Sequence, residues 1–424
     1  MYLINKYWNY GKITPLPIGM LAIQLDKELQ YTRQGAQFMP NPQWAIVRLY
    51  NKNKGTFPWG LLDRVEKILQ RYNSKMESSY KIIYNQSPQE LKPMPITLRP
   101  YQVNAVKALI NSGGILCMPT GAGKTLVVCE YLKLYPNLRS IVVVPTIDIR
   151  TQWQSYNVPN MFVTTYQNPQ LKTEKYMEQF DIHVYDECHH VAAKSLYTLA
   201  MKCKTTAKLI GCSATTNRED GEDMRIFGAL GPIIYTVKRE ELIKGGYLAN
   251  AKVFYKQPLF PNDGKYMTYQ EVYVTDIVEN DDRNSMIIST ALEEAKNQRK
   301  ILILVSQITH GEYLYNQLKD THYQVVFMNG KVKDRNRDMT PYNIIIATSI
   351  YDEGYDLPTL DTIILAAGGK SSIKLTQRIG RVLRPKHDGR AARIFDFIDT
   401  PKYLRKHYAK RREILEEDFD IEEI

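Results

Sequence analysis

Short apolar runs alternate with longer amphipathic segments through most of the chain, and this alternation predicts its fold class. The first such runs, apolar or β-branched, are Gly114–Cys117, Ile141–Val144, Ile182–Tyr185 and Leu209–Gly211. Each is separated from the next by a helix-length segment, as the strands of a parallel sheet are separated by crossover helices. The sequence therefore predicts a parallel α/β domain over residues 96–240.

The alternation pauses near Gly245 and Gly246 and then starts again. The later strand-like runs are Ile301–Val305, Gln324–Met328, Ile344–Ala347, Thr362–Ala366 and Ala392–Phe397. Segments with helical spacing, such as Gly311–Lys319 and Leu375–Arg381, lie between them. We therefore expect a second parallel-sheet domain over residues 241–424, joined to the first at about 235–255 and ending in a basic-then-acidic helix.

The first 95 residues follow a different pattern. Ile18–Leu25 and Trp44–Tyr50 have strand-like apolar content, and Asn51–Gly55 between apolar runs is typical of a turn. Leu61–Tyr72 has apolar residues at helical spacing, and Ser87–Pro95 holds three prolines, as linkers do. We expect a small α/β domain over residues 1–95.

Charge also sets this front segment apart. Residues 1–95 hold thirteen Lys and Arg against six Asp and Glu, so they carry +7 of the net charge of +11. A basic excess with a pI near 9.1 suits a polyanionic partner. Lys52 and Lys54 stand among aromatic residues here, an arrangement that favours nucleic acid. The alternative is an ordinary enzyme that happens to be basic.

Cysteine usage and hydropathy narrow the class of protein and its cellular compartment further. The five cysteines all lie between Cys117 and Cys212, and none forms a C-x-x-C pair, which argues against disulfides and zinc. We expect a cytoplasmic protein, in the host cytoplasm if a phage encodes it. The sequence contains neither an apolar run of membrane-spanning length nor a signal-peptide pattern, so we expect no membrane partner.

The stretch Met118–Thr125, M-P-T-G-A-G-K-T, has the composition of a phosphate-binding loop between a strand and a helix. Gly121 and Gly123 allow a close approach of the backbone, whose N–H groups then point at an anion. Lys124 can reach the β- and γ-phosphates, and the Thr125 hydroxyl can bind Mg²⁺. The strict pattern has glycine at the first position, where this chain has Met118.

A second constellation follows the strand-like run Ile182–Tyr185, where Asp186 and Glu187 stand side by side. Paired acids at a strand end suit nucleotide hydrolysis, with Asp186 holding Mg²⁺ and Glu187 orienting the attacking water. A solvated turn is the alternative, and the phosphate loop upstream argues against it. His189 and His190 lack the spacing of a metal site.

D-E-x-H after such a loop resembles the superfamily 2 helicases and translocases of nucleic acid. Further segments resemble the other motifs of that superfamily, in the same order: Leu98–Gln102, Val144–Thr146, Val163–Tyr166, Ser213–Thr215, Ala347–Ser349, Asp352–Asp356 and Gln377–Arg384. The resemblance implies two tandem RecA-like domains preceded by the small basic α/β domain. It also implies that ATP and Mg²⁺ bind between the RecA-like domains.

The resemblance implies roles for individual residues as well. Those implied in catalysis are Lys124, Asp186, Glu187, Gln377, Arg381 and Arg384, the last two as arginine fingers. Those implied in nucleotide binding are Arg99, Gln102, Pro119, Thr120, Gly121, Ala122, Gly123, Lys124, Thr125, Gly354 and Asp356. Those implied in nucleic-acid binding are Thr146, Thr165, Arg218 and Thr348.

The branch of the superfamily can be narrowed from two further segments. Arg218-Glu219-Asp220-Gly221 resembles an element of XPB-like helicases, and Phe38–Pro42 with Phe57–Leu62 resembles the front domain of phage UvsW-type helicases. The resemblance implies an ATP-dependent, monomeric DNA helicase that unwinds or branch-migrates forked and branched DNA. Translocation on duplex DNA without strand separation, unwinding of RNA–DNA hybrids, and a clamp that binds nucleotide without turnover are the alternatives; the intact Lys124, Glu187 and Arg384 argue against the clamp.

Overall fold

The computed structural model describes most of the 424 residues, and the chain divides into two units. The residues it describes are 2–7, 9–34, 36–72, 76–78, 98–204, 206–214, 222–260, 268–329, 340–348, 360–368 and 390–423. The first unit is Met1–Met118 with Gly123–Val237, and the second is Lys238–Ile424 with Pro119–Ala122. The front segment therefore belongs to the same unit as the first parallel sheet.

The front segment is built on a mixed sheet in the order β5-β2-β1-β6. Its strands are β1 (Tyr2–Tyr7), β2 (Tyr10–Thr14), β5 (Thr56–Pro58) and β6 (Met76–Ser78); β3 (Gln30–Thr32) pairs separately with β4 (Ile46–Arg48). The helices are α1 (Gly19–Glu28) and α2 (Leu62–Arg71), with short 3-10 turns at Ala36–Phe38, Pro42–Ala45 and Trp59–Leu61. Helix α2 confirms the predicted helix, whereas the strand predicted at Ile18–Leu25 is wrong because α1 occupies it.

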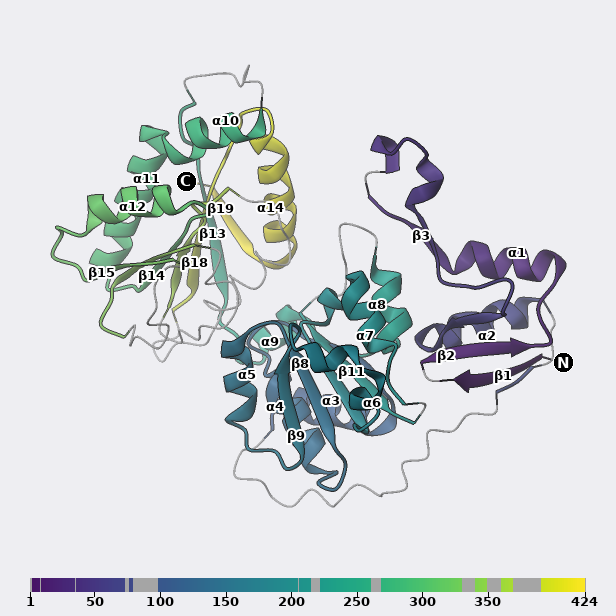
Figure 1. The fold of residues 1–424 in the computed structure, drawn as a ribbon. Helices are drawn as coiled ribbons and strands as arrows, with labels where there is room; N and C mark the ends of the chain where they lie inside the picture. Colours follow the sequence, from purple (N-terminus) through teal and green to yellow (C-terminus); the bar gives the residue numbers. More distant parts are fainter. Residues whose placement is uncertain are drawn as a thin grey trace. The chain divides into compact units, whose positions relative to one another are not determined.

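The next sheet is six-stranded and wholly parallel, in the order β12-β7-β11-β10-β8-β9. Its strands are β7 (Gly114–Cys117), β8 (Ser140–Val144), β9 (Met161–Thr165), β10 (Ile182–Asp186), β11 (Lys208–Ser213) and β12 (Ile233–Thr236). The helices, seen in Figure 1, are α3 (Pro100–Asn111), α4 (Lys124–Lys133), α5 (Ile147–Gln154), α6 (Glu174–Met177), α7 (Lys194–Ala200) and α8 (Asp223–Leu230). Residues of α6, α7 and α8 form one core with side chains of the sheet.

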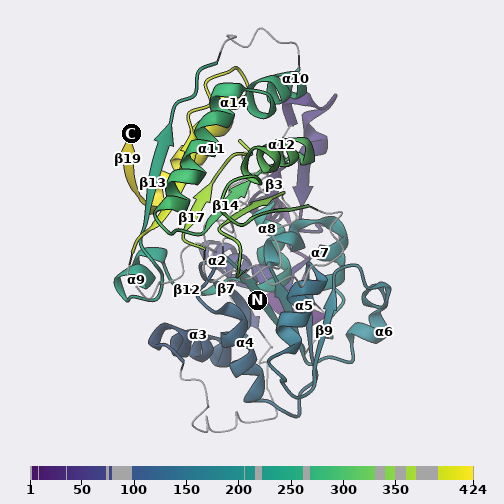
Figure 2. The ribbon, with the colours of Figure 1, turned by 90° about the vertical axis from the view of Figure 1, so that its left-hand side faces the viewer.

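The second unit holds a seven-stranded parallel sheet in the order β15-β16-β14-β17-β18-β13-β19. The strands are β13 (Ala251–Lys256), β14 (Ile301–Leu304), β15 (Val325–Met328), β16 (Ile344–Ala347), β17 (Thr362–Ile364), β18 (Ala392–Phe397) and β19 (Asp420–Glu423). Helices α11 (Asp281–Lys296) and α12 (Ile308–Leu318) cover one face and α14 (Leu404–Asp418) the other (Figure 2). Short helices α9 (Arg239–Lys244) and α10 (Tyr269–Tyr273) complete the unit.

The two parallel sheets confirm the predicted fold class. Every strand run predicted from Gly114 onward coincides with a strand, because such runs are buried on both faces and need apolar side chains at successive positions. Within the described ranges, no helix is both long and apolar enough to cross a membrane.

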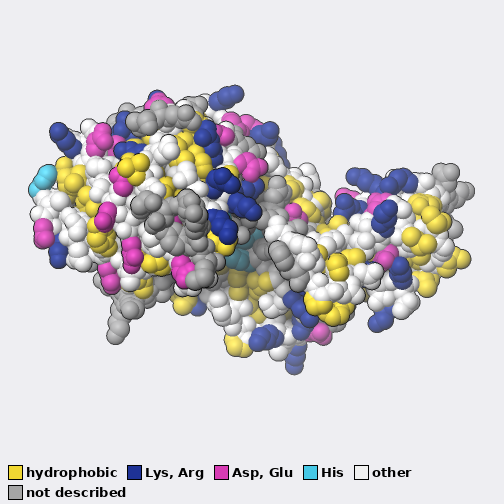
Figure 3. Space-filling view, turned by 90° about the horizontal axis from the view of Figure 1, so that it is seen from above, with side chains coloured by type: hydrophobic (Ala, Val, Ile, Leu, Met, Phe, Trp, Pro, Cys, Tyr) yellow, Lys and Arg dark blue, Asp and Glu magenta, His cyan; other side chains and the backbone are white. Residues whose placement is uncertain are grey.

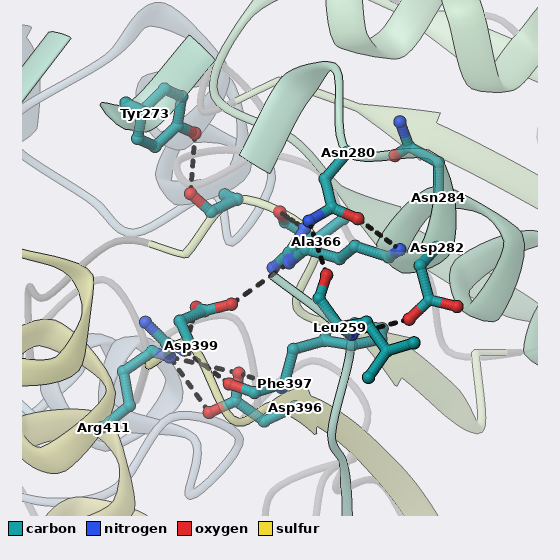
Figure 4. Close-up of polar contacts among 12 residues, drawn as sticks. Leu259, Tyr273, Asn280, Asp282, Asn284, Ala366, Asp396, Phe397, Asp399 and Arg411 are labelled. Atoms are coloured by element: carbon teal, nitrogen blue, oxygen red, sulfur yellow. Dashed lines mark hydrogen bonds and ion pairs between the residues drawn. The ribbon is translucent and has the colours of Figure 1, made fainter. Parts of the chain in front are cut away.

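A buried ionic network fastens the helices of the second unit to its sheet (Figure 4). Arg283 at the start of α11 pairs through Nε with Asp399 Oδ1 at 3.1 Å, and its Nη1 donates to the Ala366 carbonyl at 2.8 Å. Arg411 of α14 reaches Asp399 Oδ2 and Asp396 Oδ2, each at 2.9 Å. Since these four side chains are almost wholly buried, losing one partner would leave an uncompensated charge in the core.

Candidate nucleotide site

The turn between β7 and α4 has the backbone conformation that its glycines predict. Gly121 has φ +85° and Gly123 has φ +80°, in the left-handed region that side chains rarely adopt. A Cβ on Gly123 would also lie 2.5 Å from Gln102 Nε2. The positive φ therefore favours glycine at 123, where a Cβ would also have to push the Gln102 side chain aside. The turn opens directly into the N-terminus of α4, where anions bind well.

Lys124 and Met118 are connected across this turn. The Lys124 Nζ donates to the Met118 carbonyl at 3.0 Å, so the ammonium group is held beside the loop. The Met118 side chain is fully buried, and its N–H donates to the Ser213 carbonyl at 3.0 Å. The departure from the strict motif thus has a structural explanation, because the residue at 118 fills the core. Thr125 follows as the second residue of α4 and is half-buried.

Asp186 is the last residue of β10 and is 6% exposed. Its Oδ2 accepts a hydrogen bond from Trp153 Nε1 at 2.8 Å, and its Oδ1 accepts one from the Glu187 N–H at 3.0 Å. Burial raises the pKa of Asp186, while the Trp153 hydrogen bond and the charge of Lys124 oppose the rise. Trp153 lies on α5, the helix that follows the helicase-like segment Val144–Thr146, and its contact with Asp186 could not be predicted from sequence.

Glu187 has φ +47° and ψ +54°, a left-handed conformation that is uncommon outside glycine. Its Oε2 lies 3.4 Å from His189 Nδ1, and that nitrogen lies 3.2 Å from Ser213 Oγ. The Tyr166 hydroxyl donates to the Asp186 carbonyl. Side chains from two of the helicase-like segments, those of Tyr166 and Ser213, therefore meet around the paired acids, although they are far apart in sequence.

The other predicted site residues lie as follows. Gln102 closes a capping box on α3, in which its Oε1 accepts from the Arg99 N–H at 2.9 Å. Thr146 is the N-cap of α5, with its Oγ1 accepting from the Ile149 N–H at 3.4 Å, and Thr165 ends β9. Thr348 follows β16 and is buried.

Some predicted residues fall outside the described ranges, and two belong to the front segment. Pro119, Thr120 and Ala122 occupy the loop itself by chain order. The residues outside the described ranges are Arg218, Gly354, Asp356, Gln377, Arg381 and Arg384. Lys52 and Lys54 lie in the front segment, and Lys52 Nζ is 2.8 Å from Asp26 Oδ2.

Comparisons with known proteins agree with this geometry. Residues 95–157 and 155–218 match the family described as type III restriction enzyme, res subunit, and residues 282–386 match the helicase conserved C-terminal domain. The fragment structure of a putative HsdR subunit of a type I restriction enzyme from Vibrio vulnificus YJ016 has a TM-score of 0.61 at 18% identity, covering 98% of this chain and 84% of that one. At this identity the likeness concerns the fold alone.

Three curated relatives align over most of the chain. A putative helicase 22 of Sulfolobus islandicus filamentous virus is 26% identical over 76% of this chain and 68% of its own length. The ATP-dependent DNA helicase uvsW of enterobacteria phage T4 is 25% identical over 84% of this chain and 81% of its own length. The DNA 3'-5' translocase XPB2 of Sulfurisphaera tokodaii is 25% identical over 69% of this chain and 79% of its own length.

The two family models match one after the other along the chain, and the phosphate loop and the paired acids lie in one parallel-sheet domain. Together with these relatives, they define an ATP-hydrolysing helicase. The matched domains are those of superfamily 2 helicases, and the chain is similar to XPB and UvsW helicases among its relatives.

Proposed function

We propose that the protein uses ATP hydrolysis to move along DNA and remodels forked and branched DNA, by unwinding or by branch migration. The observation that carries the proposal is the extent of the match to the phage helicase uvsW, which covers 84% of this chain. That share exceeds the motor segments matched by the two family models, at 95–218 and 282–386. We propose accordingly that residues 1–95 form a DNA-engaging domain in front of the motor domains 96–240 and 241–424 of a cytoplasmic monomer.

In the nucleotide site we assign the following roles. Lys124 would bind the β- and γ-phosphates after leaving the Met118 carbonyl, with Arg99 and Gln102 near the base. Thr125 and Asp186 would hold Mg²⁺, whose charge would stabilise the ionised form of the buried Asp186 carboxylate and the phosphate oxygens. Glu187 would orient the attacking water, and Arg381 and Arg384 would supply fingers from the second domain.

In the front segment the exposed side chains favour a nucleic-acid surface. Lys12 and Lys54 are exposed beside an open groove of about 450 Å³, and Trp44 is 68% exposed. Phe57, by contrast, is wholly buried in the core of the segment, so it cannot stack on a base. On the face seen in Figure 3, Lys and Arg side chains lie beside hydrophobic and some acidic ones at the right of the view, a mixture that suits the binding of single strands and junctions.

The proposal is tested by ATPase assays and product gels on a matched fork, Holliday junction, R-loop and linear duplex. We expect DNA-stimulated ATPase, with remodelling of the fork and junction. The Glu187→Gln protein should bind ATP and leave every substrate intact. Remodelling of the R-loop alone would replace the proposal with the hybrid-unwinding alternative. Stimulation by linear duplex without any separated product would favour translocation without strand separation.

A further inference from the structure

The front segment contacts the first parallel-sheet domain through helix α8, and the two backbones approach closely there. A Cβ on Gly60 would lie 2.0 Å from the Phe227 carbonyl oxygen and 2.7 Å from the Gly231 nitrogen. The buried Asn9 Nδ2 donates to the Ala229 carbonyl at 2.7 Å, at the end of α8, and to the Ala200 carbonyl at 3.3 Å, at the end of α7. Because these contacts involve backbone atoms, the front segment holds the helix itself.

Helix α8 also belongs to two hydrophobic cores. Met224 and Phe227 pack against the core of the front segment. Ile226, Ala229 and Leu230 are buried in the core of the parallel-sheet domain. The same core includes Cys188 and Val191, from the 3-10 turn Cys188–Ala192 that begins immediately after Glu187. Movement of α8 would therefore displace side chains in both cores.

A chain of polar contacts runs through the same helix. Arg225 is 8% exposed, and its Nη1 donates to the Ala192 carbonyl at 3.0 Å, at the end of the turn after Glu187. The same nitrogen lies 3.2 Å from Glu222 Oε2. Glu222 Oε1 lies 2.9 Å from Arg33 Nε of the front segment, and the Arg225 guanidinium lies 6.0 Å from the Tyr31 ring. These contacts connect the front segment to the end of the 3-10 turn that follows Glu187.

We propose that α8 couples DNA binding by the front segment to the position of Glu187, with Arg33 and Arg225 as positioning residues. The inference rests on the proposed function, since it needs DNA as the ligand of the front segment. The left-handed backbone of Glu187 is a conformation that persists only where the surroundings fix it. Arg225 fixes the far end of the same turn, so a front segment shifted by DNA moves Glu222, Arg225 and the turn together.

Arg33→Ala tests the coupling without changing any residue near the nucleotide. The Arg33 side chain is 39% exposed, so its loss should not impair folding. Arg33→Lys keeps a cation for Glu222 and serves as the rescue variant. Arg71→Ala is the matched control, because Arg71 pairs with Glu28 at 2.6 Å within the front segment. The assay measures ATPase without DNA, kcat at saturating forked DNA, and the concentration of fork that gives half activation.

For Arg33→Ala we expect fork-stimulated kcat to fall by about fivefold or more, with ATPase in the absence of DNA and the half-activating concentration nearly unchanged. Arg33→Lys should recover most of the loss, and Arg71→Ala should resemble the unchanged protein. The inference is overturned, and the proposed function left standing, if Arg33→Ala keeps its fork-stimulated kcat. The same holds if only the half-activating concentration shifts, or if Arg71→Ala loses as much kcat as Arg33→Ala. If forked DNA does not stimulate the unchanged protein, the proposed function fails as well.

Discussion

At the scale of single residues, the contact between Trp153 and Asp186 yields the sharpest prediction. Trp153→Phe keeps an aromatic side chain, though a smaller one, and removes the N–H that donates to Asp186 Oδ2. A hydrogen bond to a buried charged group stabilises it by about 1.5–3 kcal/mol, so kcat should fall by about tenfold to a hundredfold. Steady-state ATPase checks the value. Gln154→Ala, an exposed change on the same helix, is the control, and an unaltered kcat in Trp153→Phe would show that this bond does not support catalysis.

Two neighbouring lysines of the front segment should differ in their contribution to DNA binding. Lys54 is exposed, whereas Lys52 already pairs with Asp26, which Arg48 also approaches at 3.4 Å. Lys54→Ala should therefore make the slope of log K against log salt shallower by about 0.9 for duplex DNA, and Lys52→Ala by less. Fluorescence anisotropy over a salt series measures both slopes. Equal changes would mean that the Asp26 pair opens when DNA binds.

Residues whose role depends on local spacing could be predicted, and those that depend on tertiary contacts could not. Gly121, Gly123 and Lys124 fall within one turn, so their pattern was visible in the sequence. The N–H of Trp153 meets Asp186 across 33 positions, which no local pattern encodes. The roles in binding and hydrolysis assigned to Lys124 and Asp186 remain predictions, as do those of Arg381 and Arg384.

At the scale of elements, the π-helical turn Val274–Val278 carries a buried carboxylate that should make stability depend on pH. Asp276 is fully buried. Its burial and, as a smaller contribution, the charge of Asp399 raise its pKa from 3.8 to about 6. The folded state therefore favours the protonated acid. As pH rises from about 4 to 6 the unfolded chain gives up this proton first, so the free energy of unfolding should fall and then level off.

Asp276→Asn removes the titrating group while keeping a side chain of the same shape. The variant should gain free energy of unfolding relative to the unchanged protein at pH 8, and the gain should vanish near pH 4. Urea unfolding at several pH values, followed by a signal from the second unit, measures the difference. A difference that is constant with pH would exclude Asp276 as the titrating group.

Elements were predictable where burial imposes an unambiguous pattern. The wholly apolar runs of the two parallel sheets, such as Ile344–Ala347, are strands. Ile18–Leu25 is also rich in apolar residues but forms α1, where Leu21 and Leu25 are buried at helical spacing while Met20 and Ile23 are exposed. A run this short that is buried on one face only fits both the helical period and the strand period, so its sequence does not decide between helix and strand.

At the scale of the whole molecule, the attachment of the front segment to α8 was hidden from sequence. The proline-containing stretch Ser87–Pro95 indicated a separate domain, yet the core of the front segment includes Met224 and Phe227. Contacts such as that of Asn9 with Ala229 join residues 220 positions apart. The front segment and the first parallel sheet therefore fall within one compact unit.

We expect the front segment and the first parallel sheet to unfold together, and the Gly60→Ala variant tests this. Its Cβ would meet the Phe227 carbonyl oxygen at 2.0 Å, so backbone has to shift on one side of the contact. Overpacking of this kind costs about 1–3 kcal/mol, which lowers Tm by about 2–4 °C for each kcal/mol in a domain of this size. Calorimetry should show one transition for each unit, with only that of the first unit lowered. Asp276→Asn moves the other transition and so assigns the two. A separate, additional transition for the front segment in Gly60→Ala, with the first sheet unchanged, would show that the α8 contact does not join them into one cooperative unit.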